Sequence, residues 1–268
     1  MKLKNSILPA MLLFGAAALS SCEKNERESV APAFEQGKIS HVLADSAEVR
    51  SYNFAGSQIS QINHYNPKSG ELETYEKYSR DNKGKLVKLS TYQGNSNTLL
   101  TEQQFVYNQK GDLSQTNTAY YAGGTLEYTS FAKFAYSDHK LKTKSVYEGT
   151  DKDSTSSRLK SYFEYEVLPD GNYSQEKQFV IDGTGTPKLY STTTYSYDSH
   201  ENPFHGFAEP GTISSPNNVI SYATLVHSTN KTYTYNYTFK YDDHGKAISM
   251  ATKGAKGKNE TLTFRYGS

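Results

Sequence analysis

The stretch TYTYNYTFKY, residues 232–241, decides the fold of this chain. Aromatic side chains occupy every second position, and Thr, Asn or Lys fills the positions between them. Successive side chains of a β-strand point to opposite faces, so this period of two predicts a strand with one aromatic and one hydrophilic face. We expect the aromatic face to point inward and the hydrophilic face to point to water. The aromatic face carries Tyr233, Tyr235, Tyr237, Phe239 and Tyr241.

The same pattern recurs along the chain. Each copy is an aromatic-rich strand ending in Tyr, a polar turn that usually holds Gly, and an apolar residue that begins the next strand. Gly supplies the positive φ that tight turns need, and Asp or Asn tolerates that region. One spacing of 29 residues therefore fits a hairpin of two strands, each about ten residues long, plus two turns. The evenly spaced copies are those at Tyr78, Tyr107, Tyr136 and Tyr165, and further copies begin at Tyr65, Tyr197 and Tyr241.

The repeat predicts an all-β protein with no helix after the first 21 residues. We expect an antiparallel up-and-down meander of about 12–14 strands, closed or nearly closed into a barrel, with a water-facing exterior. Residues 201–218 interrupt the pattern with three prolines and two glycines, which predicts a long loop. Residues 219–226 fit either a strand or a short helix.

The N-terminal segment, residues 1–21, has the pattern of a signal peptide. Lys2 and Lys4 precede an apolar stretch, residues 7–19, that is shorter than the roughly 20 residues of a transmembrane helix. It ends in Leu19-Ser-Ser-Cys22, which resembles the lipobox of bacterial lipoproteins. In that family the Cys is diacylated on sulfur and becomes the first mature residue. The resemblance implies a lipid on Cys22 that binds the protein to the outer membrane; an ordinary secretory signal with a chance Cys is the alternative.

Residues 22–50 are predicted to be a flexible tether, and residues 51–268 a single β-meander or barrel domain. The tether starts with a charged run at residues 23–28. Simple solvation explains these charges. The alternative is that acidic residues after the lipidated Cys resemble the surface-export signal of Bacteroidota-type lipoproteins, so the cell surface and the periplasmic face both stay open.

Composition excludes several classes of protein. Cys22 is the only cysteine, so a disulfide or a Cys-based metal site is excluded. Without Lys2 and Lys4 the mature chain has 27 of the 29 basic residues against 28 acidic ones, a net charge near −1. This balance lacks the basic excess that drives binding to nucleic acid. The chain has 23 Tyr and 12 Phe but no Trp, so its core must consist largely of aromatic rings.

The sequence holds no catalytic constellation, and we expect a protein without enzymatic activity, cofactor or metal. Its seven histidines form no His-x-x-x-His or His-Glu-x-x-His motif. His139, His200 and His244 share a place shortly after a Tyr, where a solvated turn residue is a simpler interpretation than a repeated metal or proton site. No Gly-x-Ser-x-Gly elbow is present. Paired carboxylates for glycoside hydrolysis depend on spatial proximity, and no pair stands out.

Two segments carry a family resemblance. Tyr195-Ser-Tyr197-Asp198 with Asn202-Pro-Phe204, and the run 241–245 (YDDHG), resemble tyrosine-aspartate (YD/RHS-type) β-hairpin repeats. More closely, residues 55–268 resemble a family of Bacteroidota lipoproteins with a domain of unknown function and a porin-like fold. The resemblance implies a meandering barrel or strongly curved sheet and no established activity. The turns after Tyr136 and Tyr197 lack the Gly of the motif, which weakens the hairpin prediction there.

Two classes of function remain. The first is a lipid-anchored envelope protein that binds a glycan or a partner protein, with the aromatic face of residues 233–241 as its candidate binding surface, because exposed Tyr rings stack on sugars. The second is a purely structural envelope lipoprotein whose tyrosines form a filled core. An outer-membrane channel is less favoured, because the Tyr hydroxyls would then face hydrocarbon. An enzyme is also less favoured.

Overall fold

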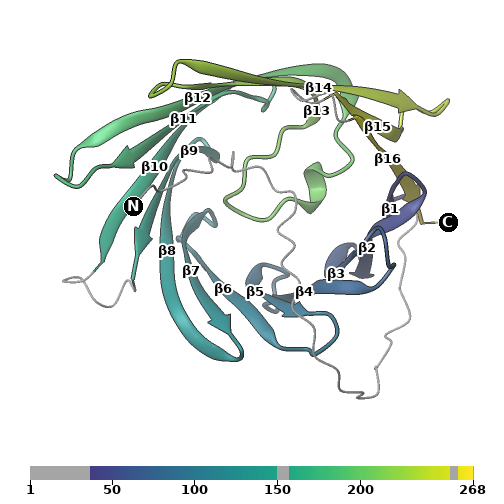
Figure 1. Cartoon of the computed structure of the whole chain (residues 1–268), viewed down its shortest axis with the longest axis horizontal. Coiled ribbons are helices and arrows are strands. Elements are labelled where there is room, and N and C mark those ends of the chain that lie inside the picture. The colour runs from purple at the N-terminus through teal and green to yellow at the C-terminus, as the bar shows by residue number, and fades with distance from the viewer. Residues whose placement is uncertain (1–36, 150–156, 254–258, 268) are drawn as a thin grey trace. The chain divides into compact units, whose positions relative to one another are not determined.

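The computed structural model describes residues 37–149, 157–253 and 259–267, which form a closed antiparallel β-barrel (Figure 1). The predicted signal peptide, Cys22 and the tether up to residue 36 lie outside the described residues. Each strand pairs with its neighbours in the chain, and the first pairs with the last. The strands are β1 (Ile39–Ala44), β2 (Ala47–Ala55), β3 (Gln58–Tyr65), β4 (Leu72–Arg80), β5 (Leu86–Gln93), β6 (Leu99–Tyr107), β7 (Leu113–Ala122), β8 (Thr125–Ser137), β9 (Lys140–Glu148), β10 (Arg158–Val167), β11 (Tyr173–Ile181), β12 (Pro187–Glu201), β13 (Asn217–Val226), β14 (Lys231–Tyr241), β15 (Ala247–Lys253) and β16 (Asn259–Tyr266). Among the described residues, no helix is long and apolar enough to cross a membrane.

The predicted all-β meander that closes into a barrel is confirmed, with 16 strands instead of about 12–14. The barrel also begins earlier than residue 51, where we expected it to begin. β1 and the first residues of β2 fall within the predicted tether. Neither strand carries the tyrosine-and-glycine turn motif, yet Ile39, Val42 and Val49 are buried, and β1 completes the barrel by pairing with β16.

The long loop predicted across residues 201–218 is present between β12 and β13. It contains one short 3-10 helix, η1 (His205–Phe207). Figure 1 shows the loop, in light green, folded across the inside of the ring of strands. We call residues 202–216 the plug. The segment 219–226, for which strand and helix both fitted, belongs to strand β13.

The turns of the predicted repeat lie mainly at one end of the barrel, where the plug also begins and ends; we call this the plug end and the opposite one the distal end. In the turn after Tyr78, Asp81 accepts hydrogen bonds from the backbone amides of residues 83 and 85, both at 2.9 Å. Gly84 adopts a φ of +80° there, as the motif predicts. The Tyr107 hydroxyl donates to the Leu86 carbonyl at 2.7 Å, so this hairpin is linked to the preceding one.

Buried apolar residues concentrate at the plug end. In the largest cluster, Phe207 of the plug lies with its ring centroid 5.6 Å from those of both Tyr52 and Phe54 on β2. Further along the plug, Gly211 has a φ of +82°, and a Cβ at this position would lie 2.5 Å from the Phe134 ring. The plug is therefore packed into the barrel as part of its core.

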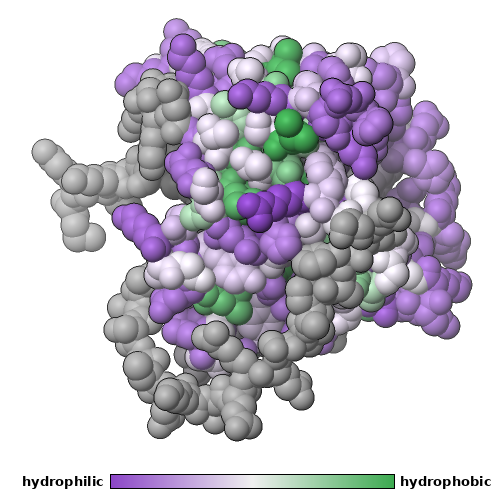
Figure 2. All heavy atoms as spheres, turned by 90° about the vertical axis from the view of Figure 1, so that its right-hand side faces the viewer, coloured by the Kyte–Doolittle hydropathy of each residue, from purple (hydrophilic) through white to green (hydrophobic). Residues whose placement is uncertain are grey.

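The outward face of the barrel is hydrophilic. On β14 the residues that alternate with the aromatic ones are Thr, Asn and Lys, and they are exposed. On the face shown in Figure 2, hydrophilic and near-neutral residues cover most of the described surface, and apolar residues form separate small patches. A membrane-spanning barrel instead carries an apolar outward band. The outward face of the barrel also holds stacked aromatic pairs, such as Tyr75 with Tyr92. Lys77 lies beside this pair.

Candidate functional site

The inward-facing side chains line a space that we call the lumen. A barrel of 16 strands is too wide for side chains on its wall to fill. Inward residues away from the plug end, such as Gln103, Thr118, Ser161 and Gln178, accordingly remain partly exposed. Residues at the plug end, by contrast, are largely buried. The lumen is therefore solvated beyond its plugged end.

A row of tyrosines forms one wall of the lumen across β12, β13 and β14. Tyr195 pairs across the sheet with Tyr222, which pairs in turn with Tyr235. The Tyr222 ring stacks on Tyr235 with 4.8 Å between centroids and lies 6.1 Å from that of Tyr237. Tyr222 is buried, whereas the other three rings are partly exposed. We call these four residues the tyrosine arc; such stacked pairs form where aromatic residues occupy opposed positions of neighbouring strands.

The five candidate residues on β14 fall into two environments. Tyr235 and Tyr237 belong to the arc, and Tyr233 lies nearer the distal end with 39% of its surface exposed. Phe239 and Tyr241 pack against the largest hydrophobic cluster at the plug end. Of the five candidates, therefore, only Tyr233, Tyr235 and Tyr237 line the solvated part of the lumen.

Tyr241 belongs to a polar cluster at the plug end. Its hydroxyl donates to the Asp198 carboxylate, and its ring stacks on His200 with 3.7 Å between centroids. Burial and the neighbouring Asp198 raise the pKa of Tyr241. Two other histidines of the repeat lie in turns: His139 is 2.7 Å from Asp112, and His244 follows Tyr241. Among the described residues, no group of three His, Cys, Asp or Glu side chains could hold a metal ion.

Two ionisable residues that sequence analysis did not single out also face the lumen. They are Lys144 on β9 and Glu176 on β11. Within the described part of the chain, neither side chain makes a hydrogen bond or an ion pair with the protein. The Lys144 ammonium lies 5.8 Å from the centroid of the Phe134 ring. Burial raises the pKa of Glu176 to about 7 although the charge of Lys144 opposes this, and burial lowers the pKa of Lys144.

A partly buried polar network joins the plug to the wall of β3 and β4. The Tyr78 hydroxyl donates to Glu76 at 2.7 Å and lies 3.4 Å from Oε1 of Glu209 on the plug. His64 Nε2 is 3.0 Å from Glu76. Burial alone would raise the pKa of Glu76, but the hydrogen bonds from His64 and Tyr78 and the charge of Arg50 lower it. Burial and the charge of Glu76 raise the pKa of Glu209 to about 7.

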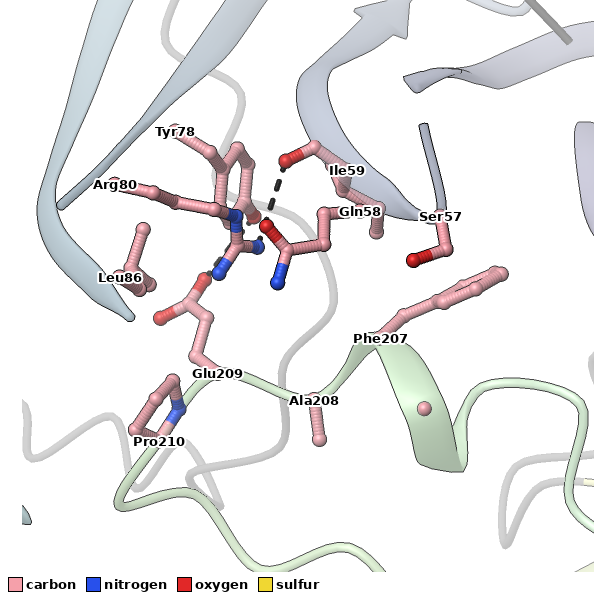
Figure 3. Close-up of a pocket in the computed structure, with 11 residues that line it drawn as sticks. Ser57, Gln58, Ile59, Tyr78, Arg80, Leu86, Phe207, Ala208, Glu209 and Pro210 are labelled. Carbon is pink, nitrogen blue, oxygen red and sulfur yellow. Dashed lines mark hydrogen bonds between the residues drawn. The ribbon is translucent and has the colours of Figure 1, made fainter. Parts of the chain in front are cut away.

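A small cavity of about 160 Å³ separates the plug from the wall (Figure 3). In Figure 3, Arg80 and Gln58 reach into it from the wall, and Phe207 and Glu209 line it from the plug. Arg80 donates to the carbonyls of Gly84 at 3.3 Å and Ile59 at 3.5 Å, so its guanidinium links the β4–β5 turn to strand β3. The cavity is polar and roomy enough to hold water behind the plug.

Comparison with protein-family models and with curated protein sequences gives no match. Solved structures do match. A porin-like protein from Bacteroides vulgatus matches with a TM-score of 0.50 and 10% identity, over 87% of this chain and 99% of that chain. A porin-like protein from Bacteroides uniformis matches with a TM-score of 0.44 and 13% identity, over 88% of this chain and 99% of that chain. The first match confirms the porin-like barrel fold, and at this identity the likeness extends to the fold alone.

Proposed function

We propose that this chain is a cell-envelope protein whose barrel binds a glycan in the lumen. The tyrosine arc carries the proposal, because it presents partly exposed aromatic rings side by side inside a solvated space. Such rings stack on the apolar faces of sugars, and their hydroxyls can bond sugar hydroxyls. A purely structural barrel, the alternative, has no need for part-exposed rings on its inner wall. In this proposal the lumen binds the glycan and does not catalyse a reaction.

The envelope location rests on the sequence motif around Cys22 and on the porin-like fold. We propose that a lipid on Cys22 attaches the protein to the outer membrane. The hydrophilic outward face of the strands supports an arrangement in which the barrel itself stays outside the lipid. The plug gives the lumen a floor, which favours a binding cavity over a channel. A ligand enters, in this arrangement, from the distal end.

A glycan array probed with the full chain tests the proposal. We expect binding to at least one class of glycan, and we expect Tyr235→Ala to weaken it about five- to tenfold, because each aromatic contact contributes about 1 kcal/mol. Tyr162→Ala is the matched control, since Tyr162 stacks on Phe179 on the outward face at 4.5 Å. If the folded wild-type protein binds no glycan on the array, the proposal is wrong. Unchanged affinity of the folded Tyr235→Ala variant would remove the arc from it.

A further inference from the structure

Lys144 and Glu176 flank a strip of aromatic rings in the lumen. We infer that this pair makes the lumen selective for acidic saccharides, meaning sugars that carry a carboxylate beside their hydroxyl groups. The inference rests on the proposed function, glycan binding in the lumen, and adds the chemical class of the ligand. It requires a cation, a hydrogen-bond acceptor and an aromatic surface within one site.

The strands place these three elements together. Lys144 pairs across the sheet with Phe163 on β10, and Glu176 pairs with Tyr165 on the same strand. The rings of Phe163 and Tyr165 are nearly parallel, with centroids 6.4 Å apart and an angle of 6° between their planes. The ammonium and the carboxylate therefore lie on either side of one aromatic strip. Thr193 borders Glu176 on its other side, next to the tyrosine arc.

Within the described residues, both charged side chains lack a hydrogen-bond or ion-pair partner, and Lys144 lies beside the Phe134 ring. A charged group with reduced access to water is costly unless it is paired, so structural charges in such positions normally form ion pairs. Among the described residues, neither Lys144 nor Glu176 has a hydrogen-bond or ion-pair partner, and both remain partly exposed rather than sealed. A ligand that displaces solvent from these two side chains must therefore offer groups that pair with them.

The chemistry of the pair identifies the matching groups. An ammonium only donates hydrogen bonds and prefers a carboxylate, whereas an ionised carboxylate only accepts them and suits sugar hydroxyls. A neutral sugar would desolvate Lys144 without pairing its charge. An amine ligand would suit Glu176 but would be repelled by Lys144. A saccharide with a carboxylate satisfies both residues, and the partly exposed Phe163 ring, backed by buried Tyr165, is available to stack on its ring.

The surrounding charges are compatible with an anionic ligand. Glu176 on the wall and Glu209 on the plug both favour the charged form of Lys144. Burial raises the pKa of each of these carboxyl groups to about 7. At neutral pH part of their negative charge is therefore missing, which weakens their repulsion of a ligand carboxylate.

Calorimetric titration of the full chain with matched saccharides tests the inference. The probes are oligogalacturonate against neutral oligogalactose, and sialyllactose against lactose. We expect the acidic member of at least one pair to bind about tenfold or more tightly, because a hydrogen bond to a charged group contributes about 1.5–3 kcal/mol. Methyl-esterified oligogalacturonate should bind like the neutral sugar, which tests the role of the charge without any mutation.

Two variants separate the roles of the pair. Lys144→Met should reduce the affinity for the acidic sugar to that for the neutral one and leave neutral binding within about twofold. Glu176→Gln should weaken both. Lys177→Met and Glu164→Gln are the controls, because these two residues lie opposite each other on the outward side of β10 and β11, the strands that carry the aromatic strip and Glu176.

The outcomes distinguish this inference from the proposed function. Equal affinity of wild type for acidic, esterified and neutral sugars overturns the inference and leaves glycan binding intact. An acid preference that survives in folded Lys144→Met overturns the role of Lys144. Absence of binding to every saccharide by a wild-type protein with a cooperative thermal transition overturns both.

Discussion

Replacing Glu209 with Gln should stabilise the barrel at alkaline pH and leave its stability unchanged at acidic pH. Glu209 is partly buried where the plug meets the wall, and desolvation together with the charge of Glu76 raises its pKa from the ordinary 4.5 to about 7. Between these two pH values the folded protein holds a proton that the unfolded chain has released. The free energy of unfolding therefore falls as the pH rises from 4.5 to 7 and stays low above that window.

The size of the effect follows from the pKa change. A rise from 4.5 to about 7 corresponds to a loss of up to about 3 kcal/mol once Glu209 is ionised. Gln has the same shape, carries no charge and can donate an amide N–H to the Tyr78 hydroxyl oxygen, whose proton goes to Glu76. Glu209→Gln should therefore regain up to about 3 kcal/mol at pH 8, or roughly 6–12 °C in Tm for a domain of this size. At pH 4 both proteins should unfold at the same temperature.

Thermal unfolding of the full chain at pH 4, 6 and 8, followed by circular dichroism, measures this difference. Glu166→Gln is the control, because it removes an exposed carboxylate from the outward side of β10 and should change Tm little at any pH. A gain from Glu209→Gln that is the same at pH 4 and pH 8 would refute the reasoning. So would a loss of stability at pH 8, since this would mean that the ionised carboxylate is favourably paired.

Three further predictions concern the plug and the anchor. Phe207→Ala should cost about 2–3 kcal/mol in urea unfolding, because the ring packs on two aromatic rings of β2; a loss below about 0.5 kcal/mol would mean that the plug is not packed. Gly211→Ala should cost more than Gly185→Ala in the same assay, because both residues have positive φ but only at Gly211 would a Cβ collide with the Phe134 ring, and equal losses would contradict this clash. Cys22→Ala should move the protein from the membrane fraction to the supernatant, and its retention with membranes would show the lipid-anchor hypothesis to be wrong.

Most of the fold could be predicted because its signals are local. Alternation and turn chemistry extend over a few residues, and the 29-residue spacing of Tyr78, Tyr107, Tyr136 and Tyr165 marks four successive turns at the plug end. β1 could not be predicted in this way. This strand has only six residues and lacks the turn motif. It is held in the barrel by pairing with β16, which lies more than two hundred residues further along the chain.

The charged pair in the lumen escaped prediction because of β-bulges. Counting by twos from buried Leu141 places Lys144 on the outward face, and counting from buried Tyr173 does the same for Glu176. A register shift beside each turn, opposite Leu141 and opposite Tyr173, reverses the alternation and turns both charges inward. The sequence signal of such a bulge is weak. The face on which a charged side chain lies therefore cannot be assigned until the strand register is known. Tyr235 and Tyr237 of the tyrosine arc could be predicted, because they lie on one unbroken alternation along β14, whereas Tyr195 and Tyr222 join them only through the pairing of β12, β13 and β14.

The seam between β1 and β16 sets the order in which the barrel assembles. Every other strand pair of the described barrel joins strands that are adjacent in the chain, so those hairpins can form locally and one after another. The seam instead brings Val42 to Phe264, and it forms only after the last strand is available. Until then two strand edges stay unpaired and can recruit other chains. We therefore expect ring closure to be the slow, aggregation-exposed step of folding, and we expect a chain that loses β16 to keep both edges open.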